Sequence, residues 1–217
     1  MGYESFVGDR PLCIGVAYLL GAIPTGYLAG KWLKGIDIRD YGSRSTGATN
    51  VLRTLGKKAG ITVLLFDALK GVAAILFFKL LYTHPEWIAF PANYDQYWLT
   101  MAVAIAAVLG HSKSIFIGFN GGKSVATSIG VLLIMAPWVA LGTIVTFAAA
   151  ITLTQIVSLS SISGAIAVML LMIVLQQPLP YILFGAIAGI YVIVRHRSNI
   201  QRIIAGTEPK IGAKATN

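Results

Sequence analysis

Apolar residues fill long blocks of this chain, and short polar stretches separate the blocks. A helix that crosses a bilayer needs about 20 predominantly apolar residues, and several blocks approach or reach that length. The stretch Ser124–Val194 contains no Asp, Glu, Lys or Arg, and Pro137, the cluster Ser158–Ser163 and residues 176–180 divide it into four pieces. We therefore predict an all-α integral membrane protein. The expected spans are residues 12–33, 59–81, 98–109, 125–136, 138–156, 162–175 and 181–194.

The distribution of Lys and Arg predicts how these spans are oriented. Residues 34–58 and 195–214 are rich in Lys and Arg, whereas residues 82–97 contain neither and carry interfacial aromatics. Basic loops stay preferentially on the cytoplasmic side. Counting the short piece 125–136 gives seven spans, and leaving it out would place the two basic stretches on opposite faces. We therefore expect one domain, residues 1–217, forming a seven-helix transmembrane bundle with its N-terminus outside and its C-terminus in the cytoplasm.

In that topology four loops meet on the cytoplasmic face. They are residues 34–58, 111–124, 157–161 and 195–208. The first two contain several glycines, which suits loops that approach a ligand closely.

Composition narrows the function classes. Hydrophobic residues make up 56% of the chain and charged residues 12%, with a mean hydropathy of +0.76. The chain has 17 Lys and Arg but only 8 Asp and Glu, and it has no soluble basic domain that could bind nucleic acid. An anionic substrate or lipid surface therefore explains the excess positive charge better. The single cysteine, Cys13, excludes a disulfide framework and a cysteine metal site. The acidic N-terminus, without an Ala-x-Ala site after the first apolar run, predicts a retained first span.

The polar stretch 42–53 lies between two apolar blocks and is the strongest candidate for a binding loop. Gly42 and Gly47 permit positive φ and hence a nest of backbone N–H groups. Four hydroxyl side chains, Asn50 and the two guanidinium groups of Arg44 and Arg53 are donors that suit phosphate oxygens. Composition alone does not distinguish a phosphate-binding loop from a simple helix N-cap inside a positively charged loop.

The second candidate loop, residues 111–124, ends in Gly122-Lys123-Ser124. It is not a Walker A motif, because that motif needs a glycine at position 117, where this chain has Ile117. A glycine turn, a lysine and a helix beginning near Ser124 still favour an anion. The alternative is a lysine that only satisfies the positive-inside bias.

Two further polar groups belong to the same face. The hydroxyl cluster at Ser158–Ser163 could merely bond its own helix, but beside the two loops it becomes a plausible binding wall. In the basic segment 195–202, His196 and Asn199 share a helical face at i, i+3, which a basic membrane anchor does not explain.

Asp67 and Lys70 form an ionisable i, i+3 pair inside a predicted span. Such pairs face the protein interior and are functional candidates, and the sequence leaves open whether this one supports the site as an ion pair or contacts substrate. His84, His111 and His196 lack metal-ligand spacing, so we expect no metal.

Four motifs, in this order, resemble those of the bacterial acyl-phosphate:glycerol-3-phosphate acyltransferases, the PlsY family. The resemblance extends from about Leu20 to Glu208. The matching residues are Gly42-Ser43, Gly47-Ala48-Thr49-Asn50 and Arg53; Gly110-His111, Gly118-Phe119 and Gly121-Gly122-Lys123; Val157-Ser158-Leu159-Ser160-Ser161; and His196, Asn199-Ile200, Arg202 and Gly206-Thr207-Glu208.

The resemblance implies a multi-pass enzyme of the bacterial inner (plasma) membrane with its active site facing the cytoplasm. It would transfer a fatty acyl group from acyl phosphate to the sn-1 hydroxyl of glycerol 3-phosphate, giving lysophosphatidic acid and phosphate, the first step of phospholipid synthesis. It would need no metal and no other cofactor. Its partners would be the two substrates, the bilayer and, through function, a soluble enzyme that produces acyl phosphate, with no nucleic acid.

Residue by residue, the resemblance implies catalytic roles for Ser43, Lys123 and His196. Asp67, Lys70 and His111 are expected to support the site. The residues expected to bind substrate are Ser43, Thr49, Asn50, Arg53, Gly121, Gly122, Lys123, Ser161, His196 and Asn199.

The chain departs from the family pattern at four positions. Arg44 and Ser45 stand where the family commonly has Gly-Asn, and Asn120 and Ser124 flank Gly121-Gly122-Lys123 where it commonly has Lys and Gly. The roles of these four residues are left open.

Two rival classes explain less of the sequence. A transporter for a phosphorylated metabolite predicts inverted repeats and a midplane site, but no repeat is visible and the polar motifs gather at one face. A different acyltransferase family would carry a His-x-x-x-x-Asp motif, but Phe116 stands where that Asp would follow His111.

Overall fold

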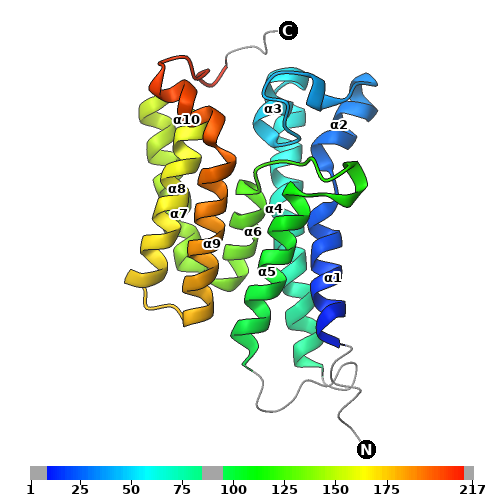
Figure 1. The fold of residues 1–217 in the computed structure, drawn as a ribbon, viewed down its shortest axis with the longest axis vertical. Coiled ribbons are helices and arrows are strands. Elements are labelled where there is room, and N and C mark those ends of the chain that lie inside the picture. The colour runs from blue at the N-terminus through cyan, green and yellow to red at the C-terminus, as the bar shows by residue number, and fades with distance from the viewer. Residues whose placement is uncertain (1–8, 85–94, 213–217) are drawn as a thin grey trace, which may run out of the picture.

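The computed structural model describes residues 9–84 and 95–212, and within them every regular element is a helix (Figure 1). The helices are α1 (Asp9–Ala22), α2 (Thr25–Lys34), α3 (Ala48–Leu55), α4 (Lys57–Thr83), α5 (Gln96–Ser112), α6 (Val125–Met135), α7 (Pro137–Thr154), α8 (Val157–Val174), α9 (Leu179–Arg195) and α10 (Arg197–Ile204). Two 3₁₀ turns, Ile38–Asp40 and Ile115–Ile117, lie in the loops before α3 and α6.

The prediction of an all-helical membrane protein is confirmed. Within the described residues, five segments are long and apolar enough to cross a bilayer by themselves, and the bent pair α9–α10 is a sixth candidate. α6 is apolar but has only 11 residues. Length and composition therefore support five or six crossings directly. They do not decide whether α6 makes a seventh.

The helix boundaries differ from the expected spans mainly at α8. We expected a loop at 157–161 and a span beginning at residue 162, whereas α8 begins at Val157 and includes the serine cluster. The break lies at Gln155 and Ile156, where Gln155 has a φ of 61°. Serine hydroxyls can bond the carbonyl one turn back, as Ser160 does to Ile156, so a serine cluster need not end a helix. The expected outside loop 82–97 falls largely outside the described residues.

The first expected span is broken. α1 ends at Ala22 and α2 begins at Thr25, because Pro24 between them has no N–H to continue the hydrogen-bond ladder. At the break, the carbonyl of Ile23 accepts hydrogen bonds from the Thr25 backbone N–H at 3.1 Å and from the Lys70 ammonium at 2.9 Å. A break inside a membrane span is tolerated where another part of the protein satisfies the exposed backbone in this way.

Glycines bring the helices of the N-terminal half into close contact. A Cβ built on Gly130 of α6 would lie 1.9 Å from the Ala68 carbonyl oxygen of α4, and one on Gly21 of α1 would lie 2.1 Å from that of Ala107 in α5. The hydrophobic effect does not drive helix association in lipid. Small residues at such crossings instead let the backbones approach closely, so that van der Waals contacts hold the helices together. This half therefore forms a tight bundle.

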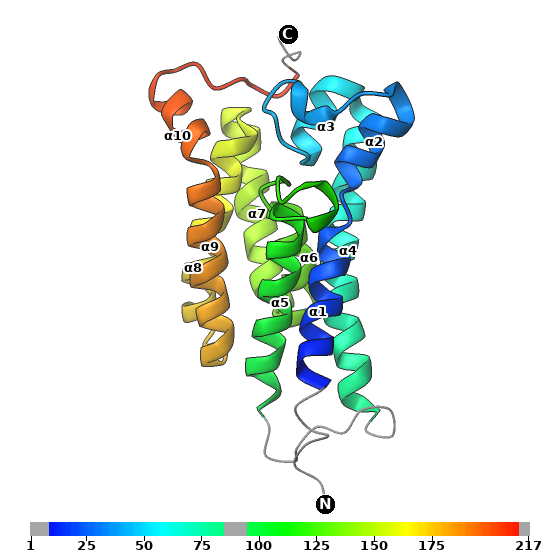
Figure 2. The same ribbon diagram turned by 45° about the vertical axis from the view of Figure 1, so that its right-hand side comes forward.

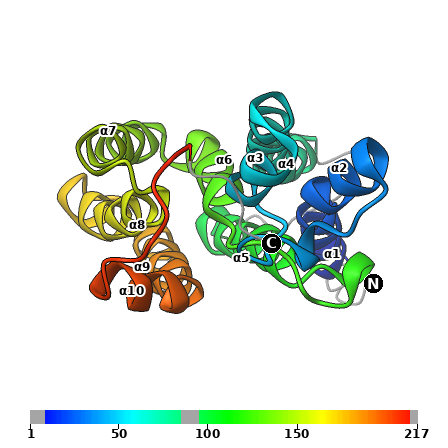
Figure 3. The same cartoon turned by 90° about the horizontal axis from the view of Figure 1, so that it is seen from above.

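Seen from one end, α7, α8 and α9 form a second group beside the bundle of α1, α4, α5 and α6 (Figure 3). The basic loops lie at the end that carries α2, α3 and α10, and α1 begins at the opposite end (Figures 1 and 2). The expected gathering of the four polar segments at one end of the bundle is thus observed, with the boundary of the third corrected to the turn at 155–156.

Candidate active site

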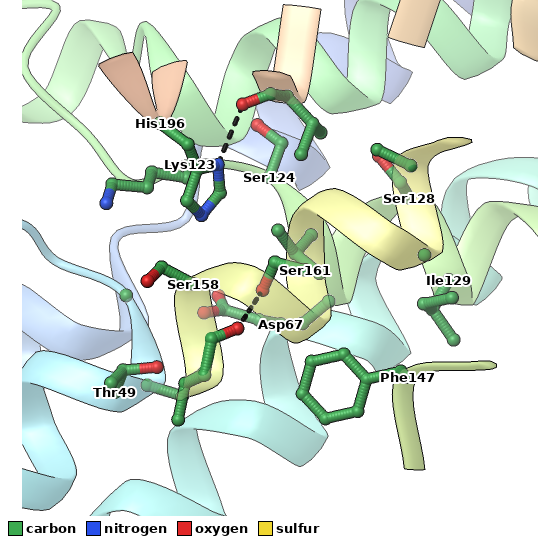
Figure 4. A pocket seen from close by; sticks show the side chains of 18 of the residues that line it. Thr49, Asp67, Lys123, Ser124, Ser128, Ile129, Phe147, Ser158, Ser161 and His196 are labelled. Carbon is green, nitrogen blue, oxygen red and sulfur yellow. Dashed lines mark hydrogen bonds between the residues drawn. The ribbon is translucent and has the colours of Figure 1, made fainter. Parts of the chain in front are cut away.

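A cavity of about 400 Å³ lies between the two helix groups. Its polar end is lined by residues from the loops and helix ends, such as Lys123 and His196, and apolar residues such as Ile129 and Phe147 line the rest (Figure 4). Of the expected site residues, those that line it are Ser43, Thr49, Asn50, Arg53, Asp67, His111, Lys123, Ser161, His196 and Asn199. Gly121, Gly122 and Lys70 do not line it.

Asn50 organises the first loop. Its carboxamide oxygen accepts from the Ser43 backbone N–H at 3.0 Å, and its amide nitrogen donates to the carbonyls of Ile38, Tyr41 and Ser45 at 2.9–3.1 Å. The residue is almost fully buried. Asn50 therefore holds the loop that presents Ser43 to the cavity, and its own amide is occupied.

The glycines of this loop have different conformations. Gly42 has a φ of 54°, which confirms the expected left-handed conformation there, and Arg44 shares that conformation. Gly47 does not: with a φ of −73° it is extended and precedes the first residue of α3. Its neighbours Ala48 and Thr49 expose the uncapped beginning of α3 to the cavity, and Arg53 follows one turn later.

Gly121 and Gly122 act through packing. A Cβ on Gly122 would lie 2.1 Å from His111 Nε2, and one on Gly121 would lie 2.1 Å from the His111 carbonyl oxygen. The Arg195 guanidinium donates to both of their carbonyls, at 3.3 and 3.1 Å. The two glycines let the loop lie flat on the end of α5, and Lys123 emerges from it toward the cavity.

Lys123 belongs to a hydrogen-bonded cluster with Asn199 and Glu208. Its ammonium donates to the Asn199 carboxamide oxygen, and the Asn199 amide nitrogen donates to Glu208 Oε1 at 2.6 Å. Burial and, to a smaller extent, the nearby arginines lower the pKa of Lys123 to about 8, although Glu208 acts to raise it. This lysine is thus poorly solvated and close to other cations, so it is well prepared to receive an anion.

Glu208 is a site residue to which we gave no role. It also accepts from Ser158 Oγ at 2.7 Å and from Arg202 Nε at 2.7 Å. Burial raises its pKa, but these hydrogen bonds and Arg202 outweigh burial and hold the pKa below its ordinary value. The sequence did contain a signal, because Glu208 is the single acidic residue after Asp95 and stands within a basic segment.

His196 is buried at the junction of α9 and α10. Its Nδ1 lies 2.7 Å from the Val192 carbonyl oxygen, which can only accept, so in the neutral ring Nδ1 carries the proton and Nε2 has the free lone pair (Figure 4). Ser161 lies across the cavity on α8 and donates to the Val157 carbonyl at 2.9 Å. The ring is therefore oriented with one nitrogen available as a base.

Asp67 and Lys70 form the buried ion pair expected from the sequence, with Nζ 2.8 Å from Oδ1. Asp67 Oδ1 also accepts from Thr25 Oγ1 at 2.5 Å and lies 3.4 Å from His111 Nδ1. These contacts connect α4 to the α1–α2 break and to α5. These contacts fit the interpretation of an ion pair that supports the site, and because Asp67 also lines the cavity, the alternative of a substrate contact stays open.

The remaining residues fall into two groups. Ser45 and Ser124 line the cavity, whereas Arg44 and Asn120 are exposed outside it. Ser124 Oγ donates to the Val108 carbonyl at 2.7 Å and does not cap α6, which begins without a side-chain cap at the cavity wall, where Val125 and Ala126 line it. Ser128, one turn further, was not expected in the site but lines it (Figure 4).

Comparisons with known proteins identify the family. A model described as "Glycerol-3-phosphate acyltransferase" matches residues 11–206. The glycerol-3-phosphate acyltransferases of Trichormus variabilis and Rippkaea orientalis are 62% and 60% identical to this chain, over 93% and 94% of it and 91% and 94% of their own lengths.

Two crystal structures of PlsY (YgiH), an integral membrane glycerol 3-phosphate acyltransferase, are similar to this fold. One is its glycerol 3-phosphate form and the other its lysophosphatidic acid form, with TM-scores of 0.83 and 0.79. Each is 36% identical and aligns over 94% of this chain and 96% of its own. With its helical membrane fold and its cationic cavity, this chain belongs to the glycerol-3-phosphate acyltransferase family.

Proposed function

We propose that this protein transfers a fatty acyl group from acyl phosphate to the sn-1 hydroxyl of glycerol 3-phosphate. The observation that carries the proposal is that one cavity joins a cationic, hydroxyl-rich end to an apolar end. Acyl phosphate has the same two parts, a phosphate and a hydrocarbon chain. The solved relative was crystallised in glycerol 3-phosphate and lysophosphatidic acid forms, which fits the same acceptor and product.

The first task of the site is to hold two anions side by side. Lys123 and Arg53 supply positive charge at the cavity wall, and the uncapped beginnings of α3 and α6 add backbone N–H donors. Ser43, Ser161 and Thr49 add hydroxyls. These groups offset the repulsion between the two phosphates and convert the encounter of two substrates into a reaction between oriented neighbours.

The second task is to stabilise the charge that develops during transfer. The acceptor hydroxyl oxygen forms a bond to the acyl carbon, and the bond from that carbon to the phosphate oxygen breaks, so phosphate leaves with the electron pair. Donors already fixed around the reacting atoms stabilise the oxyanion and the leaving phosphate without reorganising. The hydroxyl proton passes to a substrate phosphate or to His196 Nε2, the side-chain base best oriented for it.

We propose further that the chain crosses the membrane seven times, with α6 as the short crossing. α1 then begins outside, and the basic end with α2, α3 and α10 faces the cytoplasm, where the site opens. The bacterial inner membrane is the corresponding location, and a soluble enzyme that makes acyl phosphate the functional partner.

The experiment is phosphate release by the purified protein in lipid nanodiscs containing EDTA. Palmitoyl phosphate is supplied with and without glycerol 3-phosphate, and palmitoyl-CoA is the alternative donor. We expect phosphate release that depends on glycerol 3-phosphate, with lysophosphatidic acid acylated at sn-1 as the product. Turnover with palmitoyl-CoA alone would contradict acyl phosphate as the donor. Turnover that EDTA abolishes would contradict a reaction without a metal.

A further inference from the structure

The cavity has a closed inner end. Its deepest lining residues are Leu132 on α6, Thr143 on α7, Val168 on α8 and Phe184 on α9, all buried. One turn further on each helix stand Ala136, Val139, Met172 and Tyr181, which are buried in the same hydrophobic core and do not line the cavity. The space therefore ends against packed side chains.

The side of the cavity is less closed. Leu64 and Leu65 of α4 and Ile144 of α7 line it and are 39–57% exposed. An acyl chain could thus run inward to the closed end or leave sideways between α4 and α7. The two paths differ in one respect: the closed end limits the length of the chain and the side exit does not.

We propose that the inner end formed by Leu132, Val168 and Phe184 measures the acyl chain and sets a chain-length preference. This inference rests on the proposed function. Phe184 is fully buried although it borders a cavity, and Gly185 beside it packs against Met172, so the end wall is held by core packing. A wall of this kind is stiff, because close-packed interiors yield little to an added methylene.

The depth of the cavity gives the expected preference. From His196 at the polar end to Phe184, α9 rises by about 18 Å at 1.5 Å per residue. An extended chain advances about 1.3 Å per methylene, so the cavity holds roughly 14 carbons. Each methylene buried adds about fourfold to binding until the end is reached. Activity should therefore rise with chain length, stop rising near that length, and fall for longer saturated chains.

The test is the chain-length profile of kcat/KM for acyl phosphates from octanoyl to stearoyl in nanodiscs. Each variant is compared with the wild type at the same chain length, which cancels the partition of each donor into lipid. Val168→Phe should shorten the cavity and lower the ratio of palmitoyl to decanoyl kcat/KM about 15-fold, the equivalent of about two unburied methylenes. Phe184→Leu should move the preference toward longer chains.

The matched control is Ile166→Phe, which places the same side chain on the lipid-facing side of α8, where Ile166 is 45% exposed. It should leave the profile unchanged. Val168→Leu should give a smaller shift in the same direction and serves if the phenylalanine variant does not fold.

A wild-type chain-length profile in both Val168→Phe and Val168→Leu would contradict the proposal that the inner end limits chain length. It would indicate that the acyl chain leaves sideways between α4 and α7. Absence of glycerol 3-phosphate-dependent turnover with every donor in the wild type would instead overturn the proposed function, so the two failures are distinguishable.

Discussion

Most polar side chains of the site are bonded to other parts of the protein. Asn50 bonds three carbonyls and one N–H of its own loop, and Glu208 receives hydrogen bonds from Ser158, Asn199 and Arg202. Lys123 is held by Asn199. A side chain fixed by such contacts loses little conformational entropy when substrate binds and needs no reorganisation during the reaction, which is how preorganised sites gain rate.

Lys123 gives a pH prediction. Its pKa is about 8, so the ammonium in the free enzyme loses its proton as the pH rises through that value. Because the protonated form binds phosphate, kcat/KM should fall above about pH 8, and this quantity reports the free enzyme. Lys123→Arg stays charged and should lack this alkaline fall. Lys123→Ala should lose on the order of 10²-fold in kcat/KM at pH 7.

The measurement is kcat/KM for glycerol 3-phosphate from pH 6 to 10. Lys58→Ala removes an exposed lysine at the same end of the molecule and should retain the wild-type profile. An unchanged alkaline fall in Lys123→Arg would assign it to a different group.

At the level of elements, the interrupted helices carry the function. The α1–α2 break is secured by Lys70 and Asp67 of α4, and α6 and α8 each begin at the polar end of the cavity. Asp67 and Lys70 therefore couple an irregular stretch of backbone to the wall of the site. Removing one partner of a buried ion pair leaves an uncompensated charge, which costs more than losing the pair itself.

Asp67→Asn should accordingly destabilise the protein by roughly 3–5 kcal/mol. The measurement is the thermal unfolding midpoint in one detergent, with Asp40→Asn as the control, because Asp40 is exposed in the loop before α3. We expect a large fall for Asp67→Asn and almost none for Asp40→Asn. Equal midpoints would show that the Asp67–Lys70 contact does not hold the break.

At the scale of the whole molecule, the long helices of the described residues form two groups with the cavity between them (Figure 3). This arrangement places the polar end of the cavity among the basic loops and its apolar end inside the bundle. A water-soluble acceptor and a lipid-like donor can therefore reach one point from different phases. In the topology proposed above, the water-soluble acceptor enters from the cytoplasm and the lipid-like donor enters from the membrane.

Cysteine labelling tests the topology in a Cys13→Ser background. Gln155 and Gln176 flank the two ends of α8, and Trp138 is exposed at the beginning of α7. In intact spheroplasts a membrane-impermeant maleimide should label Gln176→Cys and Trp138→Cys but not Gln155→Cys, and lysis should expose all three. Labelling of Gln155→Cys before lysis would reverse the orientation, and protection of Trp138→Cys would show that α6 does not cross.

The sequence by itself determined the helical membrane class, the polar end and most of the polar residues that line the cavity, because hydrophobic length, Lys and Arg bias and short motifs are local properties. Only the tertiary structure decided what distant residues do to one another. It showed that Gly122 makes room for His111, that Asn50 is committed to its loop, and that Glu208 closes a cluster with Ser158 and Asn199. It also moved the beginning of α8 to Val157 and closed the inner end of the cavity. Such contacts join residues far apart in the chain, and no local pattern encodes them.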